Sequence, residues 1–234
     1  MSRSVLQDKF FQVLISGDRN AAREIVNQCI DGEVPADQIL EKLFWPTLQT
    51  VQKMYREDQI SVSAHNYASR ILRMLTDQMQ LRLEMAEANG RRVLLVCGPD
   101  EPNELAAQIA CDMLEAQGYE VYFAGAGLVN DELVTQLGEV EPDALVVFSS
   151  VPSDLPYVRQ LIDHLHDIGQ CPQLQVVVGG GVFNRAEGLA EEIGADLWAS
   201  TPMELVQTMI AQPDRRMDVD QRTVGRRRRS AKAA

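Results

Sequence analysis

The sequence predicts an N-terminal four-helix bundle followed by a doubly wound parallel α/β sheet. Before Gly90, apolar residues recur only at helical spacing, whereas after Arg92 short β-rich runs alternate with helical ones. The 234 residues, 45% of them apolar and 24% charged, have the composition of a globular protein of one or two domains. We expect the bundle over residues 1–90, the α/β domain over 91–212 and a basic disordered tail over 213–234.

The first part contains four amphipathic stretches. Asp18 is a good N-cap for the second stretch, which stops at Gly32. Pro35 stands at the start of the third, and Ser61 or Ser63 caps the fourth. Four such helices with short connections favour a bundle.

The second part alternates strictly between strands and helices. Strands are predicted at 93–97, 120–123, 144–148, 175–178 and 196–199. Helices are predicted at 104–117, 130–139, 155–168, 185–193 and 203–211. This pattern predicts a five-stranded, Rossmann-like sheet with flavodoxin-like strand order. Ligands of such sheets bind beyond the carboxyl ends of the strands, so the loops after the first, third and fourth strands form the candidate site.

The charge is unevenly distributed. Residues 213–234 carry eight of the 22 basic and three of the 34 acidic side chains, so the remaining chain has a net charge of −17. Such an acidic body repels phosphate backbones, and nucleic-acid binding is conceivable only through the run Arg226–Arg229. The alternative is that this run is simply solvated.

The sequence also bears on the cellular compartment. No apolar run approaches the length of a membrane span, and the N-terminus lacks the apolar segment of a signal peptide. The four cysteines lie far apart without a C-x-x-C pair, which indicates neither a disulfide framework nor a zinc site. We therefore expect a cytoplasmic protein without membrane contact.

The three candidate loops contain neither a G-x-G-x-x-G dinucleotide motif nor a phosphate-binding P-loop. They read GPDEPNELA from Gly98, SSVP from Ser149 and GGG from Gly179. Together with the four-helix cap, they resemble the cobalamin-binding module of corrinoid methyl carriers, methionine synthase and light-sensing transcriptional regulators. The resemblance covers about residues 5–211.

In that family, the first loop carries the motif D-x-H-x-x-G, whose His is the lower axial ligand of cobalt. The matching positions here are Glu101, Asn103 and Ala106. Because an amide nitrogen is a poor donor to cobalt, the resemblance implies no axial ligand from this loop. Directly before a helical stretch, Asn103 is expected to act as an N-cap.

The next two loops match the family better. Ser149 and Val151 take the positions of the S-x-L motif, whose hydroxyl bonds the nucleotide tail of the cofactor. Gly179 and Gly180, followed by Gly181, take the place of the G-G pair that lets this tail approach the backbone. The resemblance therefore implies a tail-binding site at these two strand ends.

The cap departs from the photoreceptor branch, where a Trp and a later Glu-His pair cover the upper face of cobalt. The same register places Tyr55 at the Trp, His65 at the Glu and Asn66 at the His. Imidazole is the commonest metal ligand in proteins. His65 is therefore a candidate metal ligand, the alternative being a helix residue near the domain boundary.

These features lead us to expect a non-enzymatic sensor, active in signal transduction or transcription regulation, that binds a corrinoid between cap and sheet. Haem or another tetrapyrrole is the alternative ligand. A cofactor-free interaction module and a corrinoid methyl carrier are the alternative functions, and the missing lower His counts against the carrier. No nucleophile stands beside a base, which disfavours an autonomous enzyme. A regulatory protein partner is expected, and self-association into a homo-oligomer stays open.

Overall fold

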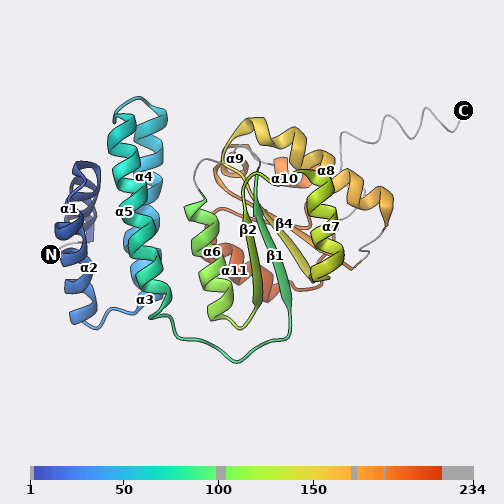
Figure 1. Ribbon diagram of the computed structural model, residues 1–234, viewed down its shortest axis with the longest axis horizontal. Helices are drawn as coiled ribbons and strands as arrows, with labels where there is room; N and C mark the ends of the chain where they lie inside the picture. Colours follow the sequence, from blue (N-terminus) through green and yellow to red (C-terminus); the bar gives the residue numbers. More distant parts are fainter. Residues whose placement is uncertain (1–2, 99–103, 170–172, 187, 218–234) are drawn as a thin grey trace, which may run out of the picture. The chain divides into compact units, whose positions relative to one another are not determined.

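The computed structural model describes residues 3–98, 104–169, 173–186 and 188–217. The chain divides into two compact units, with the boundary between Glu84 and Met85 (Figure 1). Within the described ranges, no helix has both the length and the apolar character needed to cross a lipid bilayer.

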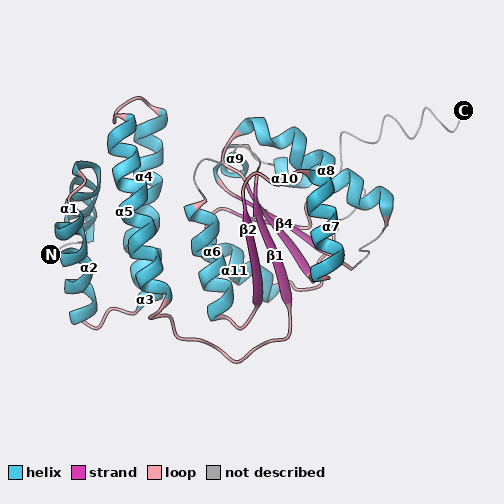
Figure 2. Cartoon of the chain, in the orientation of Figure 1, coloured by secondary structure: helices cyan, strands magenta, loops and turns pink. Residues whose placement is uncertain are grey.

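The first unit is helical (Figure 2). Its elements are α1 (Arg3–Ser16), α2 (Arg19–Asp31), α3 (Ala36–Ile39), the π-helical turn η1 (Leu40–Phe44), α4 (Trp45–Arg56) and α5 (Val62–Gln80). Since α3, η1 and α4 follow one another without a break, the unit has the four helical stretches that the periodicity predicts. Their apolar faces meet in a core where Phe10 and Phe44 stack with ring centroids 5.6 Å apart.

Side-chain caps fix where two of these helices begin. The Asp18 carboxylate accepts hydrogen bonds from the backbone N–H groups of Asn20 and Ala21, at 3.1 and 3.0 Å. The Ser61 hydroxyl accepts one from Ala64 N at 3.2 Å, so Ser61 rather than Ser63 caps α5. Each cap satisfies N–H groups that have no partner within the helix.

The π-helical turn has an identifiable cause in Pro46. Proline has no N–H, so the carbonyl four residues earlier, that of Lys42, loses its helical partner. The side-chain amide of Gln7 on α1 donates to that carbonyl at 2.7 Å instead, and Trp45 N donates five residues back to Leu40 O. The helix therefore continues through the proline, and α1 is tied to it.

The second unit is a parallel sheet covered by helices on both faces. Its strands are β1 (Arg92–Cys97), β2 (Glu120–Gly125), β3 (Ala144–Phe148), β4 (Gln175–Gly179) and β5 (Leu197–Ala199). Its helices are α6 (Leu105–Ala116), α7 (Asn130–Val140), the short 3-10 turn η2 (Pro152–Asp154), α8 (Leu155–Ile168), α9 (Gly181–Arg185), α10 (Leu189–Ile193) and α11 (Pro202–Ala211). The strand order β2-β1-β3-β4-β5, parallel throughout, confirms the predicted fold class.

One predicted element is wrong. The helix expected over 185–193 is two short helices, α9 and α10. Gly188 lies between them in the left-handed conformation, with φ +77°, which a continuous right-handed helix does not allow. The apolar spacing of the two pieces runs in one helical register, so periodicity alone could not separate them.

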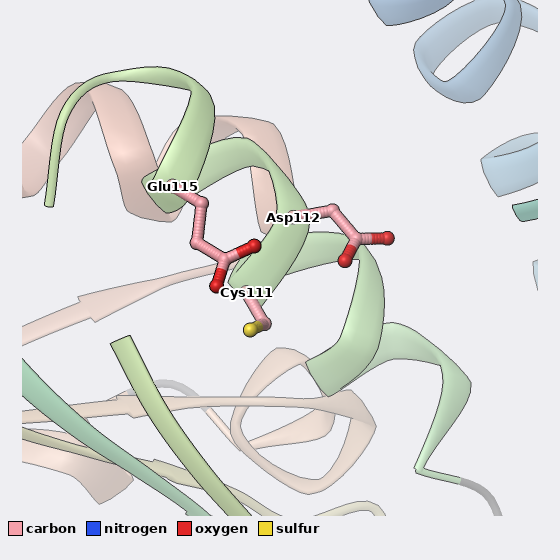
Figure 3. A group of neighbouring side chains, drawn as sticks. All are labelled: Cys111, Asp112 and Glu115. Atoms are coloured by element: carbon pink, nitrogen blue, oxygen red, sulfur yellow. The ribbon is translucent and has the colours of Figure 1, made fainter. Parts of the chain in front are cut away.

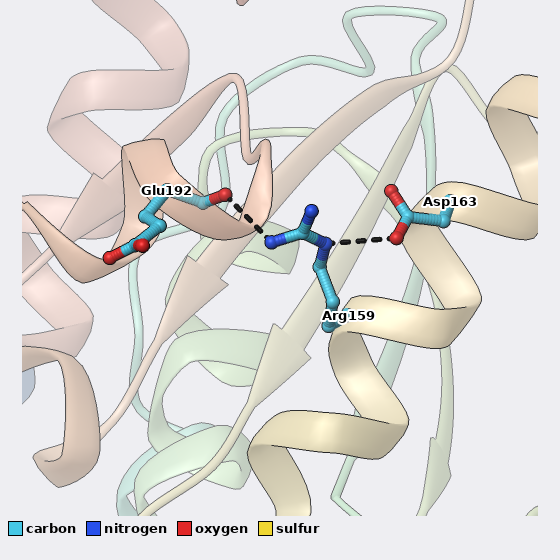
Figure 4. Close-up of polar contacts among 3 residues, drawn as sticks. All are labelled: Arg159, Asp163 and Glu192. Atoms are coloured by element: carbon cyan, nitrogen blue, oxygen red, sulfur yellow. Dashed lines mark hydrogen bonds and ion pairs between the residues drawn. The ribbon is translucent and has the colours of Figure 1, made fainter. Parts of the chain in front are cut away.

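Successive strand residues face opposite layers. One layer holds Leu95 and Val146 against α6 and α11, and the other holds Leu94 and Val147 against α7, α8, α9 and α10. Across the second layer, Arg159 of α8 pairs with Asp163 at 2.9 Å and donates to the Glu192 carbonyl of α10 at 3.1 Å (Figure 4). α8 and α10 are therefore linked to each other at the surface.

The segment that follows α11 closes the amino-terminal edge of the sheet. The buried Asp196 carboxylate accepts hydrogen bonds from Val176 N at 2.7 Å and from Met217 N at 2.5 Å. The Gln175 side chain donates to two backbone carbonyl groups within residues 212–217. The basic tail was predicted over residues 213–234; residues 213–217 belong to this anchored segment, and residues 218–234 lie outside the described residues.

Candidate functional site

The opposite, carboxyl-terminal edge brings three of the predicted loops together. Cys97, Phe148 and Gly179 are paired across β1, β3 and β4 at the last position of each strand. Beyond these strand ends, Gly98 N donates to Phe148 O at 2.8 Å and Ser149 N donates to Gly179 O at 2.9 Å. The loops with Gly98, Ser149 and Gly180 therefore begin side by side.

Ser149 lies deep in this edge, with 1% of its surface exposed. Its hydroxyl donates to Asp154 Oδ2 at 3.0 Å and lies 3.3 Å from the carbonyl oxygen of Val151, which also accepts. A hydroxyl has one proton and two lone pairs. The Ser149 proton is thus used within the protein, while the oxygen can still accept.

The three glycines at the end of β4 have different surroundings. Gly180 has φ +106°, and a Cβ there would lie 2.2 Å from Ser149 O. At Gly179 a Cβ would press on Phe148 and Leu205, while at Gly181 it would meet only the end of the Arg185 side chain and Ser150 Cβ, at 3.0 and 3.6 Å. The fold itself therefore requires glycine at position 180, whereas the tightest contact of a Cβ at position 181 is the end of the Arg185 side chain.

Asp154 is a residue of this edge that the sequence did not indicate. Its side chain is fully buried, and a Cβ on Gly98 would lie 2.0 Å from its Oδ2 atom. The carboxylate thus touches the start of the loop after β1 as well as the Ser149 hydroxyl. The only signal in the sequence is an Asp directly before a helix, and that pattern ordinarily indicates a cap.

The residues aligned with the axial-ligand motif are only partly described. Glu101 and Asn103 lie outside the described residues, and Ala106 lies half-buried in the first turn of α6, against the adjacent apolar layer. The N-cap position of α6 is Glu104, one residue later than predicted. Its Oε1 atom accepts from Ala126 N at 2.7 Å, so this carboxylate ties α6 to the end of β2 instead of capping the helix.

In the helical unit, two of the three predicted residues meet. The rings of Tyr55, at the end of α4, and His65, in the first turns of α5, stack with centroids 4.1 Å apart and planes at 20°. Burial lowers the pKa of His65, and a hydrogen bond with the Asn66 side chain opposes this shift. The imidazole is therefore neutral near pH 7, which is the form that binds metals.

Cys111, Asp112 and Glu115 form a group of possible ligand atoms within 4.8 Å of one another on α6 (Figure 3). Burial, and then the charges of Glu115 and Asp112, raise the pKa of the Cys111 thiol to about 12. A thiol binds a metal as thiolate. At neutral pH this sulfur is protonated and serves the apolar layer between α6 and the sheet.

This fold and this site define a cobalamin-binding protein, and the chain belongs to the B12-binding domain family. Residues 91–207 match the family's B12 binding domain, and residues 6–79 match a second B12 binding domain of the helical type. The predicted cofactor class is thereby confirmed.

Similar proteins span nearly the whole chain. A corrinoid protein of Desulfitobacterium hafniense (strain Y51) is 21% identical over 206 residues, which cover 86% of this chain and 94% of the relative. Dimethylamine corrinoid protein 1 of Methanosarcina acetivorans is 22% identical over 208 residues, covering 88% and 96%.

Solved structures share the fold. The monomethylamine corrinoid protein of Methanosarcina barkeri has a TM-score of 0.80 at 16% identity, covering 90% of this chain and 99% of that protein. A chain of the methanol:cobalamin methyltransferase complex from the same organism has a TM-score of 0.50 at 13% identity, covering 92% and 82%. These proteins are named for corrinoid binding and methyl transfer, so the regulatory function expected from the sequence gains no support.

The residues of the carboxyl-terminal edge fit the nucleotide part of a cobalamin. Ser149 offers a buried hydroxyl oxygen that can still accept a hydrogen bond, and the atoms nearest to a Cβ at Gly181 belong to the side chains of Arg185 and Ser150 instead of the backbone. Small residues and hydroxyl groups are what a planar base and its sugar need for close approach to a backbone. The groups at this edge are therefore compatible with a nucleotide base and its sugar.

Proposed function

We propose that this chain is a corrinoid carrier, which holds cobalamin and presents it to a methyltransferase partner. The observation that carries the proposal is coverage, since corrinoid proteins align with both units and over 94–96% of their own length. Cobalamin supplies a cobalt atom that accepts a methyl group from one molecule and passes it to another. In this role the chain is a subunit that carries a group, and the partner catalyses the transfer.

The tail of the cofactor is held, in this proposal, at the ends of β3 and β4. Ser149 and Val151 line it from one loop, and Gly179, Gly180 and Gly181 line it from the next. The geometry that supports this assignment is the pairing of Ser149 N with Gly179 O, which keeps the two loops in register.

The loop after β1 would hold the cofactor without supplying an imidazole to its cobalt. Asn103 stands where the family motif has His, with Glu101 and Ala106 at the other motif positions. We propose that the lower ligand of cobalt is the cofactor's own base, or that His65 binds cobalt from the helical unit. The neutral state of His65 and its stacking on Tyr55 support the second alternative, and Asn66 would then orient the ring.

The methyltransferase partner is inferred from the relatives, because a chain of similar fold occurs in a methanol:cobalamin methyltransferase complex. The alternative of a cofactor-free module predicts that no corrinoid is retained, and a regulator would need a regulatory target instead of a methyltransferase. No observation on this chain favours either alternative over the carrier.

The purified protein should be mixed with hydroxocobalamin, passed through a desalting column and examined by visible absorption. We expect close to one cobalamin per chain to be retained with an altered spectrum. Loss of all colour on the column, with the protein folded by circular dichroism, would exclude the proposal.

A further inference from the structure

Asp154 is a buried carboxylate at the carboxyl-terminal edge that caps no helix. It ends η2 and directly precedes α8 with helical backbone angles, φ −75° and ψ −22°, whereas a capping Asp has an extended backbone. Here the carboxylate makes no capping hydrogen bond and is turned into the protein with no exposed surface. Burying a carboxylate disfavours folding unless its oxygens are hydrogen-bonded, so the hydrogen bonds of Asp154 matter for this arrangement.

The Asp154 side chain contacts two loops of the site. Its Oδ2 atom accepts the Ser149 hydroxyl at 3.0 Å and packs so closely on Gly98 that any larger residue there would collide with it. One carboxylate therefore connects the start of the loop after β1 with the buried hydroxyl after β3.

A carboxylate accepts hydrogen bonds, and the Val151 carbonyl near the same hydroxyl is also an acceptor. Both neighbours of Ser149 Oγ therefore compete for its single proton. A ligand atom that reaches this oxygen meets lone pairs, so only a hydrogen-bond donor is matched there. A ligand acceptor would be left unpaired in a buried site.

We propose that Asp154 is a positioning residue that takes the Ser149 proton, so that the site selects corrinoids whose lower base carries a hydrogen-bond donor. This inference rests on the proposed function, and specifically on Ser149 facing the nucleotide tail. The selectivity of the site comes from the Asp154 carboxylate, which can only accept the Ser149 proton. An amide at position 154 could also donate a hydrogen bond to the Ser149 hydroxyl.

The experiment measures dissociation constants by visible absorption titration for three corrinoids. One is the form with an adenine base, which has a donating amino group. The second is cobalamin, whose dimethylbenzimidazole has a ring nitrogen that accepts and no N–H donor. The third is cobinamide, which lacks the base. We expect the wild-type protein to prefer the adenine form over cobalamin by about tenfold.

In Asp154→Asn the amide can turn to donate to Ser149, which frees the hydroxyl proton for a ligand acceptor. The tenfold preference should fall towards one, while the affinity for cobinamide stays unchanged. Ser149→Ala should abolish the preference as well, and it tests the inference even if Asp154→Asn does not fold. Asp196→Asn is the matched control, because it alters a buried carboxylate at the opposite edge and should keep the tenfold preference.

The outcomes separate the two proposals. A wild-type protein that binds both base-containing corrinoids equally well overturns the inference alone, and so does an Asp154→Asn variant that keeps the wild-type preference. A purely structural role of Asp154 would weaken binding of all three corrinoids by the same factor. Failure to retain any corrinoid overturns the proposed function and this inference with it.

Discussion

At the amino-terminal edge of the sheet, the Asp196 carboxylate accepts hydrogen bonds from two backbone N–H groups, those of Val176 and Met217. At the carboxyl-terminal edge, the Asp154 carboxylate accepts a side-chain hydroxyl and lies against Gly98. Both carboxylates are buried in the same sheet. The first secures the path of the backbone, whereas the second sets the direction of a polar side chain at the site.

This difference follows from how parallel α/β sheets are used. Their ligands bind beyond the carboxyl ends of the strands, so polar groups at the other end serve mainly to close the fold. At the amino-terminal edge, Gln175 and Asp196 hold the segment after α11 through backbone groups. Substitutions of polar residues at the amino-terminal edge should therefore change stability, whereas those at the carboxyl-terminal edge should change ligand binding.

The largest expected effect is on stability at the amino-terminal edge. Asp196→Ala removes the acceptor of the buried Val176 N–H group and of the half-buried Met217 N–H group, and the free energy of unfolding should fall by about 3 kcal/mol. Urea unfolding followed by circular dichroism measures this loss. Cobalamin affinity of the folded variant should stay within twofold of the wild type, and a larger change would contradict the separation of the two edges.

The second effect compares adjacent glycines at the carboxyl-terminal edge. Gly180→Ala should lower the free energy of unfolding by about 2 kcal/mol or more, because its φ of +106° strains a side-chain-bearing residue and its Cβ meets the Ser149 backbone. Gly181→Ala should stay within about 0.5 kcal/mol of the wild type.

A bulky residue at the same two positions separates fold from binding. Gly180→Leu would lose cobalamin simply because the loop cannot form, so it does not test contact with the cofactor. Gly181→Leu should fold and still weaken cobalamin binding at least tenfold, as measured by absorption titration. Undiminished binding would place the nucleotide tail away from Gly181.

The sequence indicated most of the fold because its signals are local. Asp18, Ser61 and the alternation of strands with helices each depend on neighbouring residues, and all three are confirmed. The division into α9 and α10 was missed because it lies in the backbone angles of Ala186 and Gly188, which the apolar spacing does not reveal.

The site was less accessible to sequence reasoning. Ser149 and the glycines were predicted through their motif positions, whereas Asp154 and Glu104 were not singled out, because each contacts a residue that is distant in the sequence. Their partners, Gly98 and Ala126, follow other strands, and an acidic residue before a helix indicates only a cap. The resemblance to the whole family also led us to favour a regulator over a methyl carrier. The reason is that the Asn at position 103, where the family motif has His, was given more weight than the length of chain that the resemblance covers.

A smaller effect is expected in the helical unit, on the pH dependence of the free energy of unfolding. The pKa of His65 is lowered by burial, so the unfolded chain takes up this proton before the folded chain does. The contribution to stability is therefore complete above about pH 6.5 and declines as the pH falls below that value. Unfolding between pH 5 and 8 should show this decline, and His65→Gln should flatten it. An unchanged profile in the variant would assign the decline to other groups.

The smallest effect is expected from the end of the chain. Deleting residues 218–234 keeps the hydrogen bonds that Gln175 and Asp196 make with residues 212–217, so unfolding and cobalamin binding should match those of the intact protein. Deletion from Pro213 onwards should be destabilising, because Gln175 and Asp196 lose the segment that they hold.

The intact chain and the chain ending at Met217 also test whether the basic run binds nucleic acid. Residues 1–217 carry 16 basic and 32 acidic side chains, so this body repels a phosphate backbone at long range. We expect neither the intact chain nor the chain ending at Met217 to shift DNA in a gel at physiological ionic strength. If the arginines Arg226–Arg229 made several phosphate contacts, the intact chain alone would bind, and its affinity would fall steeply with salt. Such salt-dependent binding would show that the tail, which lies beyond the anchored segment, adds a function that neither edge of the sheet provides.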